Sequence, residues 1–274
     1  MQNNLKISFI GGGNMAAALI GGLAGKLTAA ANIHVVDINA DSLAKLQQQF
    51  RVRTSSEIDA TLAASDVIVL AVKPQQMKGV VAQLVPHITG QLVLSIAAGI
   101  RAVDLSRWLK GHNAIVRTMP NTPALIGKGI TGMVATEGVS VEQRAAADAI
   151  MRAVGETVWL DDEKLIDPVT AVSGSGPAYV FYFIEAMQQA AQEMGLTEEQ
   201  GNALAISTFV GAAHLAEQSA DPVGVLRERV TSKGGTTYAA LTSMEASGVK
   251  QAIITAMKAA AARGQALGEE FGQD

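Results

Sequence analysis

A glycine-rich turn between an apolar strand and a helix is the feature that most constrains this fold. Residues 7–10 suit a short buried strand, and residues 17–23 continue as a helix. Gly11, Gly13 and Ala16 occupy the small-residue positions of the pattern G-x-G-x-x-A. The first glycine allows a tight turn, the second leaves room for a pyrophosphate, and the small third residue allows close helix–strand packing. The turn therefore predicts dinucleotide binding, with the phosphates at the helix N-terminus.

A second strand-like run supports this interpretation because it ends in an acid. Residues 33–36 are followed by Asp37, which stands 26 residues after Gly11. A carboxylate about 20 residues beyond the glycine pattern binds the adenine ribose in dinucleotide-binding proteins. A glycine-rich turn without a ligand is one alternative. A membrane span over the uncharged residues 7–25 is another, and the glycines and Asn14 within it argue against a span.

Composition narrows the classes of partner. The 274 residues carry a formal net charge of −4 with a pI of about 5.6, and no basic run is present, which argues against nucleic acid as the main partner. The chain has no cysteine, so disulfides, zinc thiolates and a cysteine nucleophile are excluded. The first strand starts close to the N-terminus and leaves no room for a secretory leader. We therefore expect a cytoplasmic protein that does not enter a membrane.

Strand-like and helix-like segments alternate over residues 1–162, which predicts a doubly wound α/β sheet of the Rossmann type. Apolar runs at 66–72 and 92–96 suit strands that are buried on both faces of a parallel sheet. Further strands are expected at 114–117, 131–135 and 157–160, and helices at 41–50 (with Asp41 as N-cap), 57–64, 75–85, 102–109 and 141–153. Residues 1–162 are therefore predicted to form an NAD(P)-binding domain.

The second half of the chain changes class. From Glu163 onward no strand-like run is obvious, and alanine-rich helical patterns cover 178–194, 197–218, 222–230, 236–246 and 249–267. These helices are more apolar than a small bundle with one solvated face requires, so we expect burial against a second subunit. Residues 163–274 are predicted to form an all-α helical domain for substrate binding and dimerisation.

Ligands of open α/β sheets bind at the carboxyl ends of the strands. Besides the glycine turn, three loops fall there, at 71–74, 97–99 and 119–123. The small residues at 97–99 allow a flat ring to lie against the backbone. Asn121, which lies between two prolines, offers hydrogen bonds to a carboxamide or a ribose. Lys73 suits a phosphate or ribose oxygen, and a purely solvated lysine at a strand end explains it equally well.

Two glycine–hydroxyl segments interrupt the helices of the second half. In residues 230–237, glycines and hydroxyl side chains precede a helix and form a nest of N–H donors suited to a carboxylate. A Gly C-cap followed by a Thr N-cap explains the same spacing. Residues 173–177 form a second such turn, and close helix packing explains it as well as function does. The residues alone leave these alternatives open.

No side chain stands out as a general acid or base. The four histidines fall on a strand, in loops or on an apolar helix, where structural or solvated roles are the more common ones. No acidic or histidine cluster has metal-ligand spacing, so no metal is expected. A carbonyl reductase needs a proton donor of tuned pKa, whereas a cyclic imine can bind already protonated at nitrogen. The missing donor favours an imine substrate.

Nearly the whole chain resembles the pyrroline-5-carboxylate reductase family, whose members catalyse the last step of proline synthesis. The resemblance rests on residues 10–16, 71–74, 95–99, 117–124, 173–179 and 230–237. The last three segments, in this order and spacing, are specific. The resemblance implies hydride transfer from NADPH or NADH to the C=N carbon of Δ1-pyrroline-5-carboxylate, giving L-proline. It also implies a homodimer with interlocked helical domains, often assembled into decamers.

The resemblance further implies roles for individual residues. Thr237 would hydrogen-bond the ring nitrogen of the substrate as a positioning group, and Glu163 would lie at the substrate pocket. Ser232, Gly235 and Thr236 would hold the substrate carboxylate. The cofactor contacts would come from Gly11, Gly12, Gly13, Asn14, Met15, Asp37, Ala71, Val72, Lys73, Pro74, Ala97 and Asn121. In this account the protein places the imine carbon against the cofactor.

Two residues depart from the family pattern. Lys233 stands where the family usually has proline, so the loop lacks a fixed φ, and a cation lies beside the expected carboxylate site. Asp37 stands where many members have a small or phosphate-accepting residue. An acid at this position accepts the ribose hydroxyls of NADH and repels the 2′-phosphate of NADPH. We therefore expect NADH to be used at least as well as NADPH.

Two rival interpretations explain part of the same pattern. The β-hydroxyacid dehydrogenases share the Gly-Gly-Asn-Met turn and the two-domain plan, but the lysine of their G-x-G-x-x-x-K helix start is missing here, where Val180 follows Tyr179. A non-catalytic sensor that binds NAD(P) is the rival from another class. Such a sensor would not need the nest of N–H donors in residues 230–237.

Overall fold

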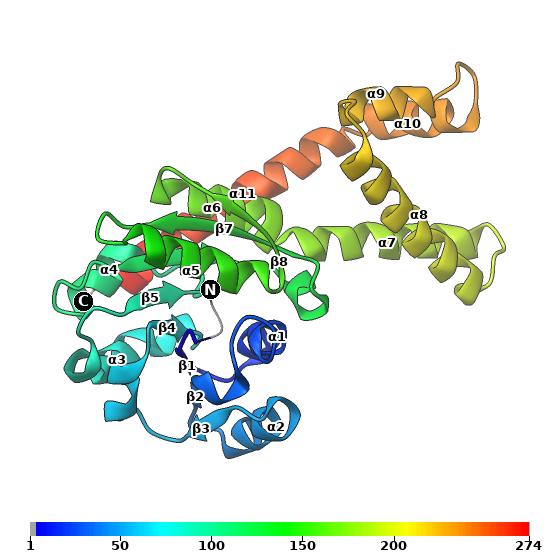
Figure 1. The fold of residues 1–274 in the computed structure, drawn as a ribbon. Coiled ribbons are helices and arrows are strands. Elements are labelled where there is room, and N and C mark those ends of the chain that lie inside the picture. Colours follow the sequence, from blue (N-terminus) through cyan, green and yellow to red (C-terminus); the bar gives the residue numbers. More distant parts are fainter. Residues whose placement is uncertain (1–3, 274) are drawn as a thin grey trace. The chain divides into compact units, whose positions relative to one another are not determined.

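The computed structural model describes residues 4–273 and divides the chain into two compact units (Figure 1). The division falls after Ser175 and again after Lys258. The first unit therefore holds the described residues before 176 and after 258, and the second holds residues 176–258.

Within residues 4–273, the first unit contains an eight-stranded sheet with the order β3-β2-β1-β4-β5-β6-β7-β8. Neighbouring strands are parallel except for the antiparallel pair β6–β7. The strands are β1 (Ile7–Ile10), β2 (Ile33–Val36), β3 (Arg53–Ser55), β4 (Val67–Leu70), β5 (Leu92–Ser95), β6 (Ile115–Met119), β7 (Gly129–Ala135) and β8 (Gly155–Trp159). The carboxyl ends of β1, β2 and β4 thus meet at the edge where the glycine turn lies.

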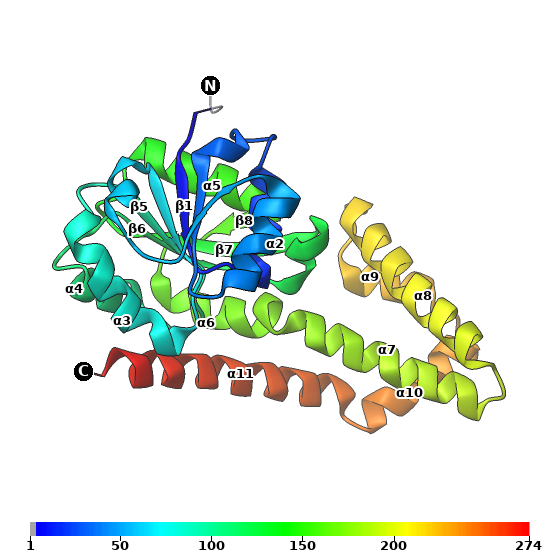
Figure 2. The same cartoon turned by 90° about the horizontal axis from the view of Figure 1, so that it is seen from below.

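Helices cover both faces of this sheet because its strands direct alternate side chains into two apolar clusters. Ile7 and Phe9 join the cluster formed with α1, α2 and α5, whereas Ile10 and Val36 join the one formed with α3 and α4. These helices are α1 (Asn14–Leu23), α2 (Ala40–Phe50), α3 (Pro74–Leu84), α4 (Ala102–Trp108) and α5 (Val141–Arg152). Figure 2 shows α3 and α4 on one side of the strands and α2 and α5 on the other. The predicted doubly wound sheet is confirmed.

The second unit is helical. It contains α7 (Gly176–Glu193), α8 (Glu198–Gln218), α9 (Val223–Arg229) and α10 (Thr236–Ala246), and α11 (Val249–Gly272) begins in it. The rings of Phe183 on α7 and Phe209 on α8 lie 6.4 Å apart. A Cβ on Gly201 would stand 3.1 Å from Ala191, so this glycine allows α7 and α8 to approach closely. Between residues 176 and 258 no strand is present, as the sequence predicted.

The compact units divide the chain differently from the predicted domains, 1–162 and 163–274. Residues 163–175 belong to the same unit as the sheet. They contain α6 (Ile166–Val169) and the π-helical turn η6 (Thr170–Gly174). A Cβ on Gly132 of β7 would stand 2.7 Å from Val169. The part of α11 after Lys258 also belongs to the first unit, and a Cβ on Gly99 would stand 3.1 Å from Leu267. Strands therefore give way to helices at Glu163, whereas the boundary between the compact units falls after Ser175.

Local structure departs from the predictions at two places. α2 has Asn39 as its N-cap, whose side chain accepts a hydrogen bond from the N–H of Ser42, so the predicted cap at Asp41 is wrong. The helix predicted at 57–64 is instead the short 3-10 helix η2 (Ala60–Ala64), which Asp59 caps. In both cases the side chain that accepts the capping bond lies before the first helical residue, as N-cap geometry requires.

Among residues 4–273, no helix is long and apolar enough to cross a membrane. The uncharged segment 7–25 forms β1, the glycine turn and α1, so the membrane-span alternative for it is wrong. Over the same described range, no group of three or more His, Cys, Asp or Glu side chains is arranged to hold a metal ion.

Candidate active site

Gly11 makes the tight turn between β1 and α1. Its N–H donates to the Val36 carbonyl at 2.8 Å, and its φ of +103° lies in the region that favours glycine. A Cβ on Gly11 would stand 2.6 Å from the Ala71 carbonyl oxygen. Backbone conformation and packing both require glycine at this position.

Gly13 is glycine for a different reason. It is the N-cap of α1 with an ordinary φ of −70°, and no atom lies within 4 Å of a Cβ built on it. No side chain caps this helix, so the N–H groups of its first turn are available to an anion. Open space beside uncapped N–H groups fits the pyrophosphate of a dinucleotide.

Asp37 is fixed at the end of β2 by the glycine turn itself. Its Oδ2 accepts from the Gly12 N–H at 2.6 Å, and its Oδ1 accepts from the Asn39 N–H at 2.8 Å. The Ser42 hydroxyl donates to the Gly12 carbonyl at 2.7 Å, so both backbone polar groups of Gly12 are hydrogen-bonded. Two backbone bonds orient the carboxylate and leave acceptor lone pairs for a ligand. The bracing of the turn by Asp37 was not predicted.

A cavity of about 830 Å³ opens beside the carboxyl ends of β1, β2 and β4. This volume falls in the usual range of ligand pockets, about 300–1,000 Å³. Six predicted cofactor contacts line the cavity, namely Gly11, Gly13, Asp37, Ala71, Val72 and Lys73. Gly12, Asn14, Met15 and Pro74 adjoin them in the chain. Glu57 also lines the cavity. It was not predicted, because β3, the strand before it, has no clear pattern in the sequence.

Ala97 and Asn121 are not among the residues that line this cavity, and they follow β5 and β6. Ala97 is buried. The side-chain amide of Asn121 is bonded to protein: Oδ1 accepts from the Ile130 N–H at 3.0 Å, and Nδ2 donates to the Ser173 carbonyl at 3.2 Å. Asn121 therefore ties the loop after β6 to β7 and to η6. Cofactor contacts at Ala97 and Asn121 stay predictions.

The predicted carboxylate-binding residues lie together in the second unit, between α9 and α10. Gly234 has a φ of +74°, and the Gly235 N–H donates to the Ser232 carbonyl at 3.0 Å. Gly235 is the N-cap of α10 and supplies no side chain, so the helix starts uncapped at Thr236 and Thr237. Free N–H groups at such a start suit a carboxylate. The alternative of a Thr N-cap is wrong, because glycine occupies the cap.

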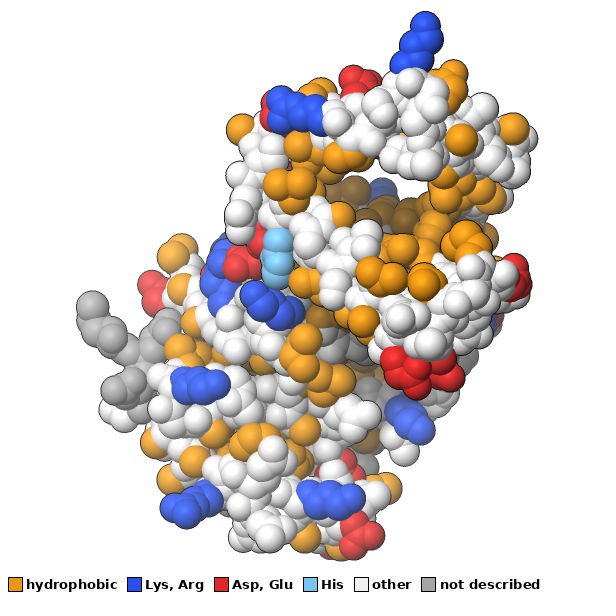
Figure 3. All heavy atoms as spheres, turned by 90° about the vertical axis from the view of Figure 1, so that its right-hand side faces the viewer, with side chains coloured by type: hydrophobic (Ala, Val, Ile, Leu, Met, Phe, Trp, Pro, Cys, Tyr) orange, Lys and Arg blue, Asp and Glu red, His pale blue; other side chains and the backbone are white. Residues whose placement is uncertain are grey.

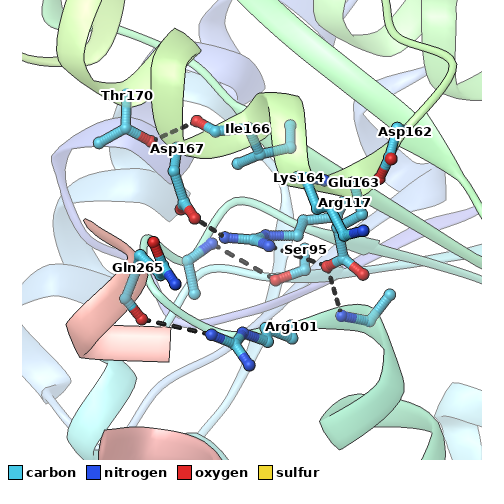
Figure 4. Close-up of polar contacts among 12 residues, drawn as sticks. Ser95, Arg101, Arg117, Asp162, Glu163, Lys164, Ile166, Asp167, Thr170 and Gln265 are labelled. Atoms are coloured by element: carbon cyan, nitrogen blue, oxygen red, sulfur yellow. Dashed lines mark hydrogen bonds and ion pairs between the residues drawn. The ribbon is translucent and has the colours of Figure 1, made fainter. Parts of the chain in front are cut away.

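Glu163 lies in the first unit and is held by two donors (Figure 4). Its Oε1 accepts from the Ala102 N–H at 2.7 Å and from Nη1 of Arg117 at 2.8 Å. The Arg117 side chain is 4% exposed, and its Nη2 lies 3.9 Å from Oδ1 of Asp167. Burial raises the pKa of Asp167, and the charge of Arg117 opposes that shift. These partners of Glu163 were not predicted, and its place at the substrate pocket stays a prediction.

The histidines show no sign of a catalytic role. None of the four, all within residues 4–273, lines the cavity beside β1, β2 and β4. On β2, Nε2 of His34 lies 3.0 Å from the Ser55 hydroxyl, and burial lowers the pKa of this histidine. The side chain of His34 is therefore buried and joins β2 to β3.

Two family models match the chain. The model described as pyrroline-5-carboxylate reductase dimerisation matches residues 163–267. The model described as NADP oxidoreductase coenzyme F420-dependent matches residues 6–99. The first match begins at Glu163, where strands give way to helices.

Curated relatives match almost from end to end. The chain is 45% identical over 269 residues to the pyrroline-5-carboxylate reductase of Pseudomonas aeruginosa, covering 98% of each protein. It is 41% identical to the pyrroline-5-carboxylate reductase of Haemophilus influenzae, covering 97% of this chain and 98% of the relative.

Solved structures agree with these relatives. A pyrroline-5-carboxylate reductase from Coxiella burnetii superposes with a TM-score of 0.90 at 40% identity, covering 97% of this chain and 99% of that one. The pyrroline carboxylate reductase of Plasmodium falciparum, solved with NADP bound, gives a TM-score of 0.88 at 29% identity, covering 98% and 100%.

Proposed function

Because this chain belongs to the pyrroline-5-carboxylate reductase family, we propose that it reduces Δ1-pyrroline-5-carboxylate to L-proline. The proposal rests on the presence in one chain of two features: a glycine turn that lines a cavity and leaves open space at Gly13, and an α10 N-terminus that no side chain caps. When bound, NADH or NADPH supplies a hydride to the C=N carbon. Binding, orientation and charge compensation are the work of the chain's own residues.

In this proposal the glycine turn holds the pyrophosphate of the nucleotide. Gly13 leaves the space, and Asn14 and Met15 begin the uncapped helix α1. Asp37 accepts the hydroxyls of the adenine ribose. Lys73 is exposed at the cavity wall, where its ammonium group reaches a phosphate or ribose oxygen.

The substrate carboxylate is bound at the N-terminus of α10, by the residues Ser232, Gly235 and Thr236. Exposed Lys233 in the same turn adds positive charge near it. The Thr237 hydroxyl hydrogen-bonds the ring nitrogen. The family resemblance also assigns Glu163 to the substrate pocket, and its Oε1 accepts from the Ala102 N–H and from Arg117.

Reduction of a protonated imine needs no general acid from the protein. The substrate nitrogen carries its proton when it binds, and addition of hydride to the carbon gives the amine directly. Thr237 therefore orients the ring and is not a proton source.

NADH is proposed to serve at least as well as NADPH. The Plasmodium relative was solved with NADP, so members of this family accept a 2′-phosphate. In this chain Asp37 is held at the ribose end of the cavity by two backbone bonds, and Glu57 lines the same cavity. Two carboxylates make the site unfavourable for a further negative charge.

The helical domain, residues 163–274, is proposed to form a homodimer. Helices of the second unit expose large apolar side chains, which Figure 3 shows gathered on one face. Phe181, Tyr182, Leu204 and Val210 are among the exposed apolar side chains of these helices. Contiguous apolar surface of this kind marks a protein interface. Assembly of dimers into decamers and a cytoplasmic location are further parts of the proposal.

The test follows nicotinamide absorbance with pyrroline-5-carboxylate and either NADH or NADPH. Wild type is expected to turn over, and Thr237→Ala to lose about tenfold or more in kcat/KM, the value of one hydrogen bond. Thr208→Ala is the matched control, because that hydroxyl donates to the Leu204 carbonyl of its own helix. Nucleotide binding without turnover would refute the proposal and favour a non-catalytic sensor.

A further inference from the structure

Glu163 caps a helix to which it does not belong. Its carboxylate comes from η5 (Glu163–Leu165), yet Oε1 accepts from the N–H of Ala102, the first residue of α4, at 2.7 Å. The N-cap residue of α4 is Arg101, whose own side chain makes no capping bond. A helix start needs acceptors for its free N–H groups and favours a negative charge. Glu163 supplies both from 61 residues away.

A buried arginine keeps Glu163 in place. Nη1 of Arg117 donates to the same Oε1 at 2.8 Å, and the arginine side chain is 4% exposed. Arg117 lies on β6 and pairs in register with Ser95 of β5. A buried guanidinium that loses its carboxylate is strongly unfavourable, so the ion pair holds Glu163 to the sheet. One carboxylate oxygen thereby ties β6 to the start of α4 (Figure 4).

The turn at residues 96–101 connects β5 to α4. It contains Ala97, a predicted cofactor contact, and Gly99, whose φ is +75°. The end of α11 packs on the turn, since a Cβ on Gly99 would stand 3.1 Å from Leu267 and 3.2 Å from Phe271. The sheet fixes the beginning of the turn, and the bond from Ala102 to Glu163 fixes its end.

We propose that Glu163 is a positioning residue for hydride transfer, which holds the turn at 96–101 in shape by capping α4 through the Ala102 N–H. The positioning role rests on the proposed function, whereas the cap does not. A displacement of about 1 Å between reacting groups costs as much as a hundredfold in rate. The expected signature is a fall in kcat with nearly unchanged nucleotide affinity, because Glu163 does not line the cavity of Asp37.

Two double variants isolate the capping oxygen. Arg117→Met removes the buried charge, so that Glu163 can be changed without stranding it. On this background, Glu163→Gln keeps an oxygen that accepts from Ala102, and Glu163→Ala removes it. The two proteins differ only in whether residue 163 carries a side-chain oxygen, and both lack the Arg117 partner of Asp167, so that loss cancels in the comparison.

Amide hydrogen exchange on the nucleotide-free proteins reads the cap directly. Removing the oxygen is expected to speed exchange at Ala102 by about tenfold, and the glutamine form to stay within about threefold of wild type. In parallel, kcat is expected to be about tenfold or more lower in the alanine form than in the glutamine form, while their Kd values for NADH, measured by its fluorescence, agree within about threefold. Glu269→Gln is the control, because its carboxylate lines the same cavity as Glu163 but pairs with Arg101 at 3.7 Å.

The outcomes separate the two proposals. Unchanged exchange at Ala102 in the alanine form would overturn the cap, and faster exchange with wild-type kcat would overturn the positioning role. Absence of turnover in the wild-type protein would overturn the proposed function and the positioning role with it, whereas a protected Ala102 amide would still support the cap.

Discussion

Removing the charge of Asp37 is expected to shift coenzyme preference towards NADPH. The carboxylate is held by the N–H groups of Gly12 and Asn39, at 2.6 and 2.8 Å, so it cannot turn away from a ligand without breaking both bonds. Asp37→Asn keeps the size of the side chain and removes its charge. The amide group cannot accept from both backbone groups equally well, so the variant also loosens the turn, and that loss affects both coenzymes alike.

The magnitude follows from the position of Asp37. Two unit charges 4 Å apart interact by about 1 kcal/mol in water and about 4 kcal/mol at an effective dielectric of 20. Asp37 is half-buried in the cavity wall, between these limits. A repulsion of about 2 kcal/mol against the 2′-phosphate corresponds to roughly a 30-fold change in relative kcat/KM.

The assay compares kcat/KM for NADH and NADPH in wild type, Asp37→Asn and Glu57→Gln. The ratio is the informative quantity, because damage to the turn cancels in it. Glu57 is exposed on the same cavity, so its variant is expected to shift the ratio less. Wild-type discrimination against NADPH should also weaken as salt shortens the Debye length from about 30 Å at 0.01 M to about 10 Å at 0.1 M. A ratio for Asp37→Asn within threefold of wild type would refute the reasoning.

Three further substitutions test the structure. Gly13→Ala is expected to leave Tm unchanged, measured by calorimetry, and to weaken NADH binding about tenfold, measured by fluorescence titration. Gly79→Ala is the control, because a Cβ on Gly79 also has no atom within 4 Å, and it should change neither quantity. Gly155→Ala is expected to prevent folding, seen by circular dichroism, because its Cβ would stand 1.9 Å from a β7 carbonyl oxygen. Burial raises the pKa of Asp148, but three donated hydrogen bonds outweigh it and lower that pKa. Asp148→Asn should therefore lose about 2 kcal/mol in urea unfolding at pH 7, a loss that shrinks below about pH 4 as the wild-type carboxylate protonates.

The sheet could be predicted where its strands are continuous apolar runs. β4 and β5 are buried on both faces, so their sequences have no polar alternation and stand out from the helices around them. β3 has three residues, and Arg53 at its start is exposed. A short polar edge strand leaves no such pattern, and for this reason Glu57 in the loop after it was also missed.

The geometry of the glycine turn could be predicted because it is local. Gly11 and Gly13 stand two residues apart, and the requirements of the turn act on each directly. The bond between Glu163 and the Ala102 N–H joins residues 61 positions apart, and its donor is backbone that any residue supplies. The one available signal was Arg117, a charged residue within an apolar strand, which needs a buried partner.

The family resemblance assigns ligand contacts to two kinds of residue: those that face open space and those that are bonded to the protein's own backbone. Gly13 faces open space and makes no contact that a methyl group would disturb, so its substitution can act only on the ligand. Asn121 and Glu163 instead bond to backbone N–H groups, at 3.0 and 2.7 Å, and hold loops at the ends of β6 and β5. A substitution at either one changes the protein before any ligand binds. Residues of the first kind should therefore lose affinity at constant stability, and those of the second should lose local protection in the free enzyme. Activity measurements alone would count both kinds as active-site residues, and exchange measurements on the nucleotide-free protein separate them.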